Sequence, residues 1–405
     1  MISFPAFLDA LGLPEPYDWQ RAFAERCAAG SPPAVVGVPT GSGKTTAVEA
    51  LVWALAMQAE RPAAVRTVGV RTVWAIDRRI LVDEVHGRAR RLAARLADAL
   101  EDETSVLHPV AARLARLGGG RPLIATRWRG GIDDPRELLG PQQPQVITST
   151  VAQIGSRLLF RGYGVAPGSL ALEAGLAACD TTICLDEAHL AGPFKQTVAA
   201  VAELRAAAPA APGLPALRLI TLTATPSDGG DEEEVVRLSD ADRRQLGCRY
   251  TGEKIARLAD AGARANESAR VELLVERTLG HVADGADSVA CVANTVRRAR
   301  AVFLRLKETL PEDVGLCLLI GPQRPVDRDR LLSDYGGKLF ERSPDGKRLV
   351  CVATQTFEVG LDADVEAMVT ESASMQALVQ RLGRLNRRGC RRGRATIVRD
   401  PEPWL

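Results

Sequence analysis

The 405-residue sequence has little of several features that mark particular classes of protein. Its eight cysteines include no C-x-x-C pair and several lie in apolar runs, so we expect reduced thiols, not disulfides or a zinc site. The N-terminus has no basic start and carries Asp9 and Glu15, which argues against a signal peptide. No apolar run is long enough to span a membrane. Together these absences predict a cytoplasmic protein.

Lysine and net charge are also scarce. Six lysines are present, Lys44 among them, and the formal net charge is only +2. Any surface for nucleic acid must therefore be local, since the chain as a whole has almost no excess positive charge. Apolar residues make up 46% and charged residues 25%, which is ordinary for a protein with buried cores. The length is sufficient for two or three domains.

Apolar, β-branched runs alternate with helical patterns from about residue 34 onward, which predicts an α/β fold with mostly parallel sheets flanked by helices. The clearest helical pattern covers residues 83–100. We expect a first domain over residues 1–230, a connection over 231–275 and a second domain over 276–405. Strands are predicted at 34–38, 72–76, 123–126, 146–148, 182–185 and 217–222, and then at 288–292, 315–320, 349–353, 367–370 and 395–398.

A glycine-rich turn, PTGSGKTT, follows the first predicted strand. Its glycines can adopt backbone conformations that a side chain forbids, and the N–H groups of such a turn can hold phosphate oxygens. Lys44 adds a positive charge for the β and γ phosphates, and Thr45 offers a hydroxyl to Mg²⁺. Val38 stands where the G-x-x-x-x-G-K-[ST] pattern has its first glycine, and a chance glycine turn is the alternative interpretation. The predicted nucleotide contacts here are Thr40, Gly41, Ser42, Gly43, Lys44, Thr45 and Thr46.

Two carboxylates follow the predicted strand at residues 182–185. In a parallel sheet this is the carboxyl edge, where ligands bind. Asp186 is suited to holding Mg²⁺, directly or through water, and Glu187 to polarising the water that attacks the γ-phosphate. An ordinary pair of charges at a strand end is the alternative, but the preceding loop at Lys44 argues against it. His189 has no H-E-x-x-H partner, so we do not expect it to bind zinc. No N-K-x-D run is present to read guanine, so we expect the nucleotide to be ATP rather than GTP.

The strings PTGSGKT at 39–45 and DEAH at 186–189 resemble motifs I and II of superfamily 2 helicases of the DEAH type. Further stretches resemble the other motifs in family order and extend the resemblance over nearly the whole chain. Gln20 lies where the family has a glutamine that reads adenine, and the later motifs correspond to Thr223–Thr225 (III), Asn294–Thr295 (IV), Ala353–Asp362 (V) and Gln380–Arg387 (VI). The resemblance implies two tandem RecA-like P-loop domains with ATP and Mg²⁺ between them.

The resemblance also assigns roles in the second domain. Arg384 and Arg387, three residues apart, are expected to lie on one helical face and to reach the γ-phosphate. Gln380 is expected to position the γ-phosphate or the attacking water, and Arg381 to brace the cleft. The loop that contacts the nucleotide sugar in this family corresponds to Gly360 and Asp362.

Contacts to a single strand of nucleic acid are predicted where polar residues follow strands at the same sheet edge. Hydroxyls, backbone N–H groups and arginines there can hold phosphates without reading sequence. Trp128 can stack on a base or lie buried, and the arginine pair at 78–79 can simply be solvated. The candidates are Arg78, Arg79, Arg127, Thr148, Thr150, Thr354 and Gln355.

Longer stretches, at 76–83, 148–164, 185–194, 356–360 and 380–389, resemble the helicase portion of the CRISPR-associated helicase–nuclease of type I systems, closest to the I-U (I-G) branch. The resemblance implies antiviral defence, in which a guide-RNA effector (Cascade-type) complex recruits an ATP-driven 3′-to-5′ translocase to displaced single-stranded DNA. That family also contains a metal-dependent His-Asp nuclease.

None of the four histidines is followed by aspartate, so we expect no HD nuclease domain and no nuclease activity here. The nuclease would then be a separate protein or a missing part of a longer one. Two alternatives stay open: a general superfamily 2 DNA or RNA helicase, and a non-catalytic ATP-binding module of a larger complex.

Overall fold

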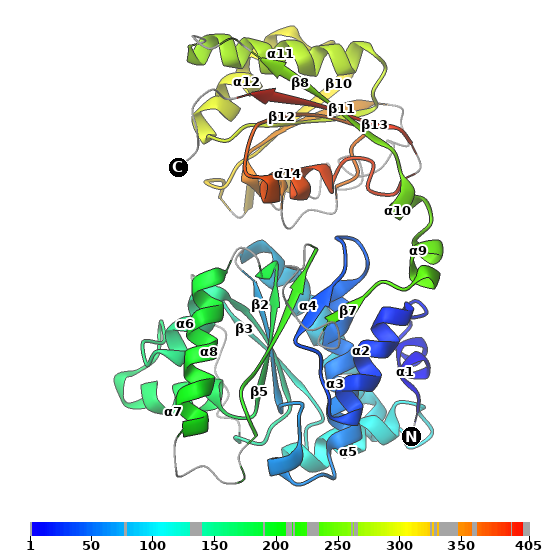
Figure 1. The fold of residues 1–405 in the computed structure, drawn as a ribbon, viewed down its shortest axis with the longest axis vertical. Helices are drawn as coiled ribbons and strands as arrows, with labels where there is room; N and C mark the ends of the chain where they lie inside the picture. Colours follow the sequence, from blue (N-terminus) through cyan, green and yellow to red (C-terminus); the bar gives the residue numbers. More distant parts are fainter. Residues whose placement is uncertain are drawn as a thin grey trace. The chain divides into compact units, whose positions relative to one another are not determined.

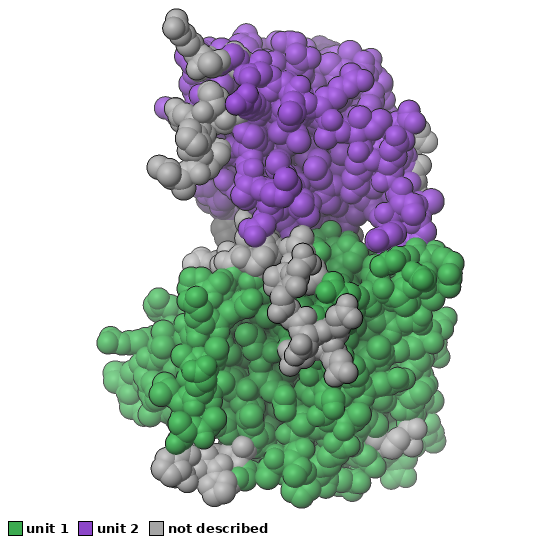
Figure 2. All heavy atoms as spheres, viewed as in Figure 1, with its two compact units in different colours: residues 1–245 green, residues 246–405 purple. Residues whose placement is uncertain are grey.

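The computed structural model describes two compact units, Met1–Gln245 (unit 1) and Leu246–Leu405 (unit 2), which Figure 2 shows in different colours. The described residues are 2–76, 79–129, 140–188, 191–207, 213, 215–224, 235–260, 262, 266–324, 326–327, 330–331, 347–358, 363–389 and 391–399, with the backbone alone for 79–81.

Unit 1 contains a seven-stranded sheet in the order β3-β4-β2-β5-β6-β1-β7, and each neighbouring pair is parallel. Because side chains alternate along a strand, β2 contributes Trp74 and Ile76 to one core and Val73 and Ala75 to another. The strands are β1 (Val35–Gly37), β2 (Arg71–Ile76), β3 (Ile124–Trp128), β4 (Gln145–Thr150), β5 (Thr181–Asp186), β6 (Arg218–Thr223) and β7 (Val235–Arg237).

Helices cover both faces of this sheet, with α2, α3 and α5 on one side and α6, α7 and α8 on the other (Figure 1). The first core includes side chains of α1 to α5, and the second includes side chains of α6 to α8. The helices are α1 (Phe4–Ala10), α2 (Asp18–Ala29), α3 (Ala47–Gln58), α4 (Arg79–Glu101), α5 (His108–Gly118), α6 (Val151–Leu158), α7 (Leu170–Ala178), α8 (Gly192–Ala207) and α9 (Asp240–Leu246), with 3₁₀ turns η1 (Lys44–Thr46), η2 (Ala63–Val65) and η3 (Pro167–Ser169).

Unit 2 contains a six-stranded parallel sheet in the order β10-β11-β9-β12-β13-β8. Alternate residues of β9 again enter two cores, one of which includes side chains of α11 and α12. The strands are β8 (Lys254–Asp260), β9 (Ser288–Val292), β10 (Val314–Leu319), β11 (Arg348–Ala353), β12 (Ala367–Glu371) and β13 (Gly393–Arg399). The helices are α10 (Cys248–Thr251), α11 (Glu267–Ala283), α12 (Val296–Thr309) and α14 (Met375–Leu382), with the 3₁₀ turn η6 (Gln355–Phe357).

The predicted fold class is confirmed: both sheets are parallel and flanked by helices, and all eleven predicted strands are present with small shifts of their ends. Sequence patterns did not predict β7 and β8, which lie within the expected connection at 231–275 and extend the edges of the two sheets. β7 has only three residues, and the side chains of β8 are mostly exposed, so neither gives a hydrophobic signal. Backbone pairing with β1 and β13 holds them instead.

Two expectations from composition can be compared with the described residues. The seven cysteines among them are free thiols, as predicted, and Cys390 lies outside the described part. In the same part of the chain, no helix combines the length and the apolar composition needed to cross a bilayer.

Candidate nucleotide site

The glycine-rich turn follows β1 at the carboxyl edge of the unit 1 sheet. Val38 is fully buried, and its N–H donates to the carbonyl of Thr223 at 3.1 Å, so pairing with β6 continues through this position. Position 38 therefore belongs to the core, and a valine fits where the usual pattern has glycine. The Ser42 hydroxyl donates to the Pro39 carbonyl at 2.7 Å and closes the turn that begins there.

Two side chains of α2 hold this loop. Trp19 donates from Nε1 to the Ser42 carbonyl at 3.2 Å, and Gln20 donates from Nε2 to the Gly43 carbonyl at 3.0 Å. Gly43 has a φ of 80°, and a Cβ there would lie 2.7 Å from Gln20 Nε2. The left-handed backbone therefore favours glycine, and a side chain there would displace the Gln20 amide from its hydrogen bond. The structure brings Gln20 to the loop, and its expected role in reading adenine stays a prediction.

The residues after the loop form the turn η1 before α3 begins at Ala47. Thr46 accepts a hydrogen bond at 3.2 Å from Arg88 of α4, and the same guanidinium forms a bidentate pair with the buried Glu49 at 2.6 and 3.0 Å. No motif signalled Arg88 or Glu49, because their pairing depends on the packing of α4 beside α3. The hydroxyl of Thr45 makes no hydrogen bond within the described residues.

Lys44 faces the acidic residues at the end of β5. β6 separates β5 from β1, and its Leu222 is in register with both Val36 and Asp186. The flexible lysine side chain spans this gap and places Nζ 3.8 Å from Glu187 Oε1. This ammonium is buried and has no hydrogen-bond partner among the described residues, so it is poised for an anionic ligand.

The carboxylates are held in a constrained arrangement. Glu187 has a φ of 51°, a left-handed conformation that costs a non-glycine residue on the order of 1 kcal/mol or more. Its N–H donates to Asp186 Oδ1 at 3.0 Å. Burial raises the pKa of the Asp186 carboxyl to about 6, the Lys44 ammonium opposes this rise, and the Glu187 carboxylate adds to it.

These residues fit a nucleotide with Mg²⁺ by their chemistry. Asp186 and Thr45 offer the hard oxygen ligands that Mg²⁺ prefers, and a divalent cation would stabilise the ionised form of Asp186. The buried Lys44 ammonium suits phosphate oxygens. The described structure thus brings together a candidate phosphate-binding loop, a candidate metal ligand and a candidate base at one edge of one sheet.

Unit 2 presents a second group of predicted residues after α14. The expected common helical face for Arg384 and Arg387 is wrong, because α14 ends at Leu382, before either arginine. Leu385 is fully buried and forms a β-bridge with Val365, which draws the chain out of the helix. Asn386 then takes a φ of 43°, so the backbone between Arg384 and Arg387 is not helical.

Arg381, in the last turn of α14, is almost fully buried and uses all five of its N–H donors. Nε and Nη2 donate to Glu358 Oε1 at 3.0 and 2.8 Å, and Nη2 also donates to Asn294 Oδ1 at 2.9 Å. Nη1 donates to Thr370 Oγ1 at 2.8 Å and to the Glu371 carbonyl at 3.0 Å. This arginine connects the ends of three strands within unit 2, β9, β11 and β12.

Arg384 is buried but less fully bonded. Its Nη2 donates to the Glu358 carbonyl at 3.1 Å, while its Nε has no partner among the described residues. Arg387 is partly exposed, and its backbone N–H donates to Asp364 Oδ1 at 2.6 Å. Gln380 is 4% exposed within α14. Gly360 and Asp362, together with His189 and Thr225, lie outside the described residues.

Comparison with known proteins adds to this geometry. Residues 285–390 match the family model described as CRISPR-associated nuclease/helicase Cas3, C-terminal. A curated CRISPR-associated helicase Cas3 of Thermoproteus tenax is 28% identical over 182 residues, which are 36% of this chain and 30% of that relative. Residues 285–390 are therefore similar to the C-terminal part of Cas3-type nuclease/helicases. The narrower I-U (I-G) resemblance stays a prediction.

Solved structures share the fold of almost the whole chain. Cas3 from T. fusca, in a crystal structure with ATP, aligns over 99% of this chain with a TM-score of 0.62 and 17% identity. A CRISPR RNA-guided surveillance complex in a pre-nicking state contains a chain that aligns over 99% with a TM-score of 0.57 and 19% identity. This chain spans about half the length of these two neighbours, 48% and 47% respectively.

The predicted strand contacts in unit 1 differ in solvent exposure. Thr148 is fully buried, so it has no surface for a ligand and is removed from the candidates. Thr150 is 7% exposed and accepts from the Gln153 N–H at 3.3 Å as the N-cap of α6. Arg127 is partly exposed and pairs with Asp83 at 3.1 Å. Arg78, and the side chain of Arg79, lie outside the described part.

Trp128 illustrates how packing decided between two alternatives. It is partly buried against the second core, and the guanidinium carbon of Arg157 lies 4.2 Å from the centroid of its ring. Arg157 is itself buried and pairs with Glu173 at 2.8 Å. One face of the indole is thus occupied, which favours the packing role over base stacking.

In unit 2, the two candidates follow β11. Thr354 is 3% exposed, whereas Gln355 is exposed. Gln355 donates from Nε2 to the Asn294 carbonyl at 3.0 Å, which fixes its side chain beside the end of β9. Gln355 is therefore the better placed of the two to meet a nucleic-acid backbone.

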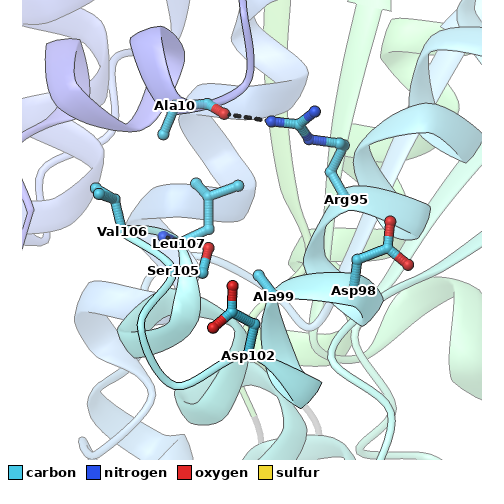
Figure 3. A pocket seen from close by; sticks show the side chains of 8 residues that line it. All are labelled: Ala10, Arg95, Asp98, Ala99, Asp102, Ser105, Val106 and Leu107. Carbon is cyan, nitrogen blue, oxygen red and sulfur yellow. Dashed lines mark hydrogen bonds between the residues drawn. The ribbon is translucent and has the colours of Figure 1, made fainter.

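A surface pocket of about 380 Å³ lies elsewhere in unit 1 (Figure 3). It is formed at the C-terminal end of α4 and the segment after it, and it includes Arg95, Asp98 and Asp102. α4 begins after the carboxyl end of β2 and runs for 23 residues, about 34 Å at 1.5 Å per residue. The pocket is therefore at the opposite edge of the sheet from Lys44 and is no part of the nucleotide site.

Proposed function

We propose that this chain is the ATP-driven motor of a type I CRISPR system, which moves 3′ to 5′ along single-stranded DNA after a guide-RNA effector (Cascade-type) complex has opened the target. The observation that supports hydrolysis is the buried Lys44 ammonium 3.8 Å from Glu187, beside Asp186. The similarity of residues 285–390 to the Cas3 family model, together with the curated Cas3 relative, supports the CRISPR context. The direction of movement rests on family resemblance.

In this proposal each side chain has a defined task. Lys44 binds the β and γ phosphates, while Thr45 and Asp186 would hold Mg²⁺, which neutralises phosphate charge when bound. Glu187 orients the attacking water and accepts its proton as the bond from the γ-phosphorus to the leaving ADP oxygen breaks. Arg384 supplies positive charge to the transition state.

DNA is the proposed track because the structural neighbours include Cas3 and a CRISPR surveillance complex. Arg127 and Gln355 are exposed enough to contact a phosphate backbone. Arg127 lies near the end of β3, and Gln355 follows β11. Contacts of this kind hold a strand without reading its sequence, which is what movement along any target requires.

The test compares ATP hydrolysis by the full chain with single-stranded DNA, with RNA and without nucleic acid. We expect stimulation by DNA, and loss of turnover with retained ATP binding in Glu187→Gln. Glu203→Gln, an exposed glutamate of α8, is the matched control and should behave as wild type. Stimulation by RNA alone would instead indicate a general superfamily 2 helicase. ATP binding without turnover on saturating DNA would indicate a non-catalytic module.

Nuclease activity is not part of the proposed function of this chain. His86, His108 and His281 lie in α4, α5 and α11, and no cluster of three or more metal-binding side chains occurs among the described residues. We expect labelled single-stranded DNA to stay intact in the ATPase reactions with Mg²⁺ or Mn²⁺. Shortened DNA products that disappear with EDTA would contradict this expectation.

A further inference from the structure

A buried carboxylate near the end of unit 1 has no role in the motifs. Asp242 of α9 has no exposed surface, yet it carries a group that is costly to bury without partners. Its Oδ1 accepts from the Asp18 N–H at 2.6 Å, and its Oδ2 accepts from the Trp19 N–H at 3.1 Å and from the Ser239 N–H at 2.9 Å. Three backbone donors therefore converge on one carboxylate.

Two of these donors belong to the first turn of α2, more than 220 residues earlier in the chain. Donors in the first turn of a helix lack partners within the helix, and a carboxylate there also interacts favourably with the helix dipole. Asp242 thus caps α2 from another helix. Ser239 closes the arrangement, since its hydroxyl accepts from the Asp242 N–H at 3.0 Å and donates to Asp18 Oδ2 at 3.0 Å.

The capped turn of α2 is the turn that holds the phosphate loop. Trp19 bonds to the Ser42 carbonyl and Gln20 to the Gly43 carbonyl, as described above. Gln20 also accepts from the Tyr17 N–H at 3.0 Å, which fixes the orientation of its amide. A continuous series of hydrogen bonds therefore runs from Asp242, through α2, to the backbone beside Lys44.

We propose that Asp242 is a positioning residue of the nucleotide site, which sets ATP affinity by holding Trp19 and Gln20 against the phosphate loop. The inference rests on the proposed ATP-binding function and assigns a residue that no motif includes. Because unit 2 begins at Leu246, the last residue of α9, the same carboxylate anchors the segment through which the chain leaves unit 1. Asparagine at 242 would lose the charge and replace one acceptor with an N–H₂ donor facing backbone donors.

The test measures equilibrium binding of a fluorescent ATP analogue and steady-state ATP hydrolysis by the full chain. We expect Asp242→Asn to weaken binding and raise the KM for ATP by about tenfold, while kcat at saturating ATP falls by less than about threefold. Asp240→Asn is the matched control: this carboxylate lies in the same helix with an 82% exposed side chain, and its loss should change binding by less than about twofold.

A double-mutant comparison separates positioning from a general loss of stability. If Asp242 acts through α2, Asp242→Asn should weaken binding by less than about threefold when Gln20→Ala is already present. The inference would be overturned if the double variant lost affinity by the product of the two single losses, or if Asp242→Asn bound the ATP analogue as tightly as wild type. If circular dichroism shows that Asp242→Asn does not fold, Ser239→Ala is the milder change. We expect Ser239→Ala to weaken binding of the ATP analogue by about threefold, and unchanged binding in this variant would also overturn the inference. A wild-type chain that binds no nucleotide would overturn the proposed function itself.

Discussion

In unit 1 the Lys44 ammonium has no hydrogen-bond partner among the described residues, whereas in unit 2 all five N–H groups of Arg381 have one. Lys44 Nζ is buried without a hydrogen bond among the described residues, and the nearby Asp186 carboxyl has a raised pKa. Arg381 instead donates five hydrogen bonds to its own unit. The first arrangement is suited to receive a charged ligand, and the second to keep a charged side chain in place.

The same contrast occurs within three residues of unit 2. Arg381 is saturated, but Arg384 retains an Nε that has no partner among the described residues. Glu358 serves both, through its carboxylate for Arg381 and its backbone carbonyl for Arg384. We therefore propose that Arg381 stabilises unit 2 and that Arg384 takes part in ATP hydrolysis.

The largest effect is expected from Lys44→Ala, which removes the buried ammonium that faces Glu187 in unit 1. Because this ammonium would contact phosphates in both the bound and transition states, kcat/KM for ATP should fall by about 10³-fold or more. Steady-state ATPase assays with single-stranded DNA measure it, with the exposed Lys195→Ala as control. Unchanged hydrolysis in Lys44→Ala would show that the nucleotide site has been misassigned.

Arg384→Ala should act on turnover rather than on folding. Arginines that stabilise phosphoryl-transfer transition states are worth about 10³–10⁵ in rate, and the loss of one of two candidate arginines should lower kcat by about 10²-fold. Affinity for an ATP analogue and the melting temperature should change little. Arg392→Ala, an arginine with a 69% exposed side chain that pairs with Glu253, is the control. A kcat equal to wild type would exclude Arg384 from the chemistry.

Arg381→Ala should show the opposite pattern, with stability as the main loss. The change removes the guanidinium that pairs with Glu358, which is 5% exposed, and breaking a buried pair costs about 3–5 kcal/mol. Chemical denaturation monitored by circular dichroism should show unit 2 unfolding at lower denaturant. Wild-type unfolding together with a large loss of kcat would mean that Arg381 and Arg384 have exchanged roles.

The smallest effect is a gain in stability from Asp186→Asn in the nucleotide-free chain. Burial raises the pKa of this acid from 3.8 to about 6, so its ionised form destabilises the folded state at neutral pH. Replacement should increase the free energy of unfolding by about 1–2 kcal/mol above pH 6, and the gain should vanish as the pH falls from 6 toward 4. Thermal melts across this range measure it, and a loss of stability at pH 7.5 would contradict it.

Much of the fold could be predicted because buried parallel strands leave continuous apolar runs in the sequence. β7 and β8 could not, since a three-residue strand and an exposed edge strand are held by backbone pairing and not by side-chain pattern. The end of α14 was also missed. The helical spacing of Arg384 and Arg387 is a local property, whereas the bridge between Leu385 and Val365 is tertiary.

For the candidate nucleotide site too, the sequence indicated some features and the tertiary structure decided others. The sequence alone identified Lys44, Thr45, Asp186 and Glu187 as candidates, because phosphate and metal chemistry calls for these side chains at fixed positions after a strand. Only the tertiary structure decided that Lys44 would face Glu187 across β6, because strand order is set by the packing of the whole sheet.

Tertiary structure also decided which residues support the site. Arg88 and Asp242 carry no motif, and Thr148 follows a pattern typical of ligand contacts yet is buried. A buried charge must find its partners wherever the fold places them, and those of Asp242 include Asp18 and Trp19, more than 220 residues away. Such partnerships arise from distance in space, which no local stretch of sequence records.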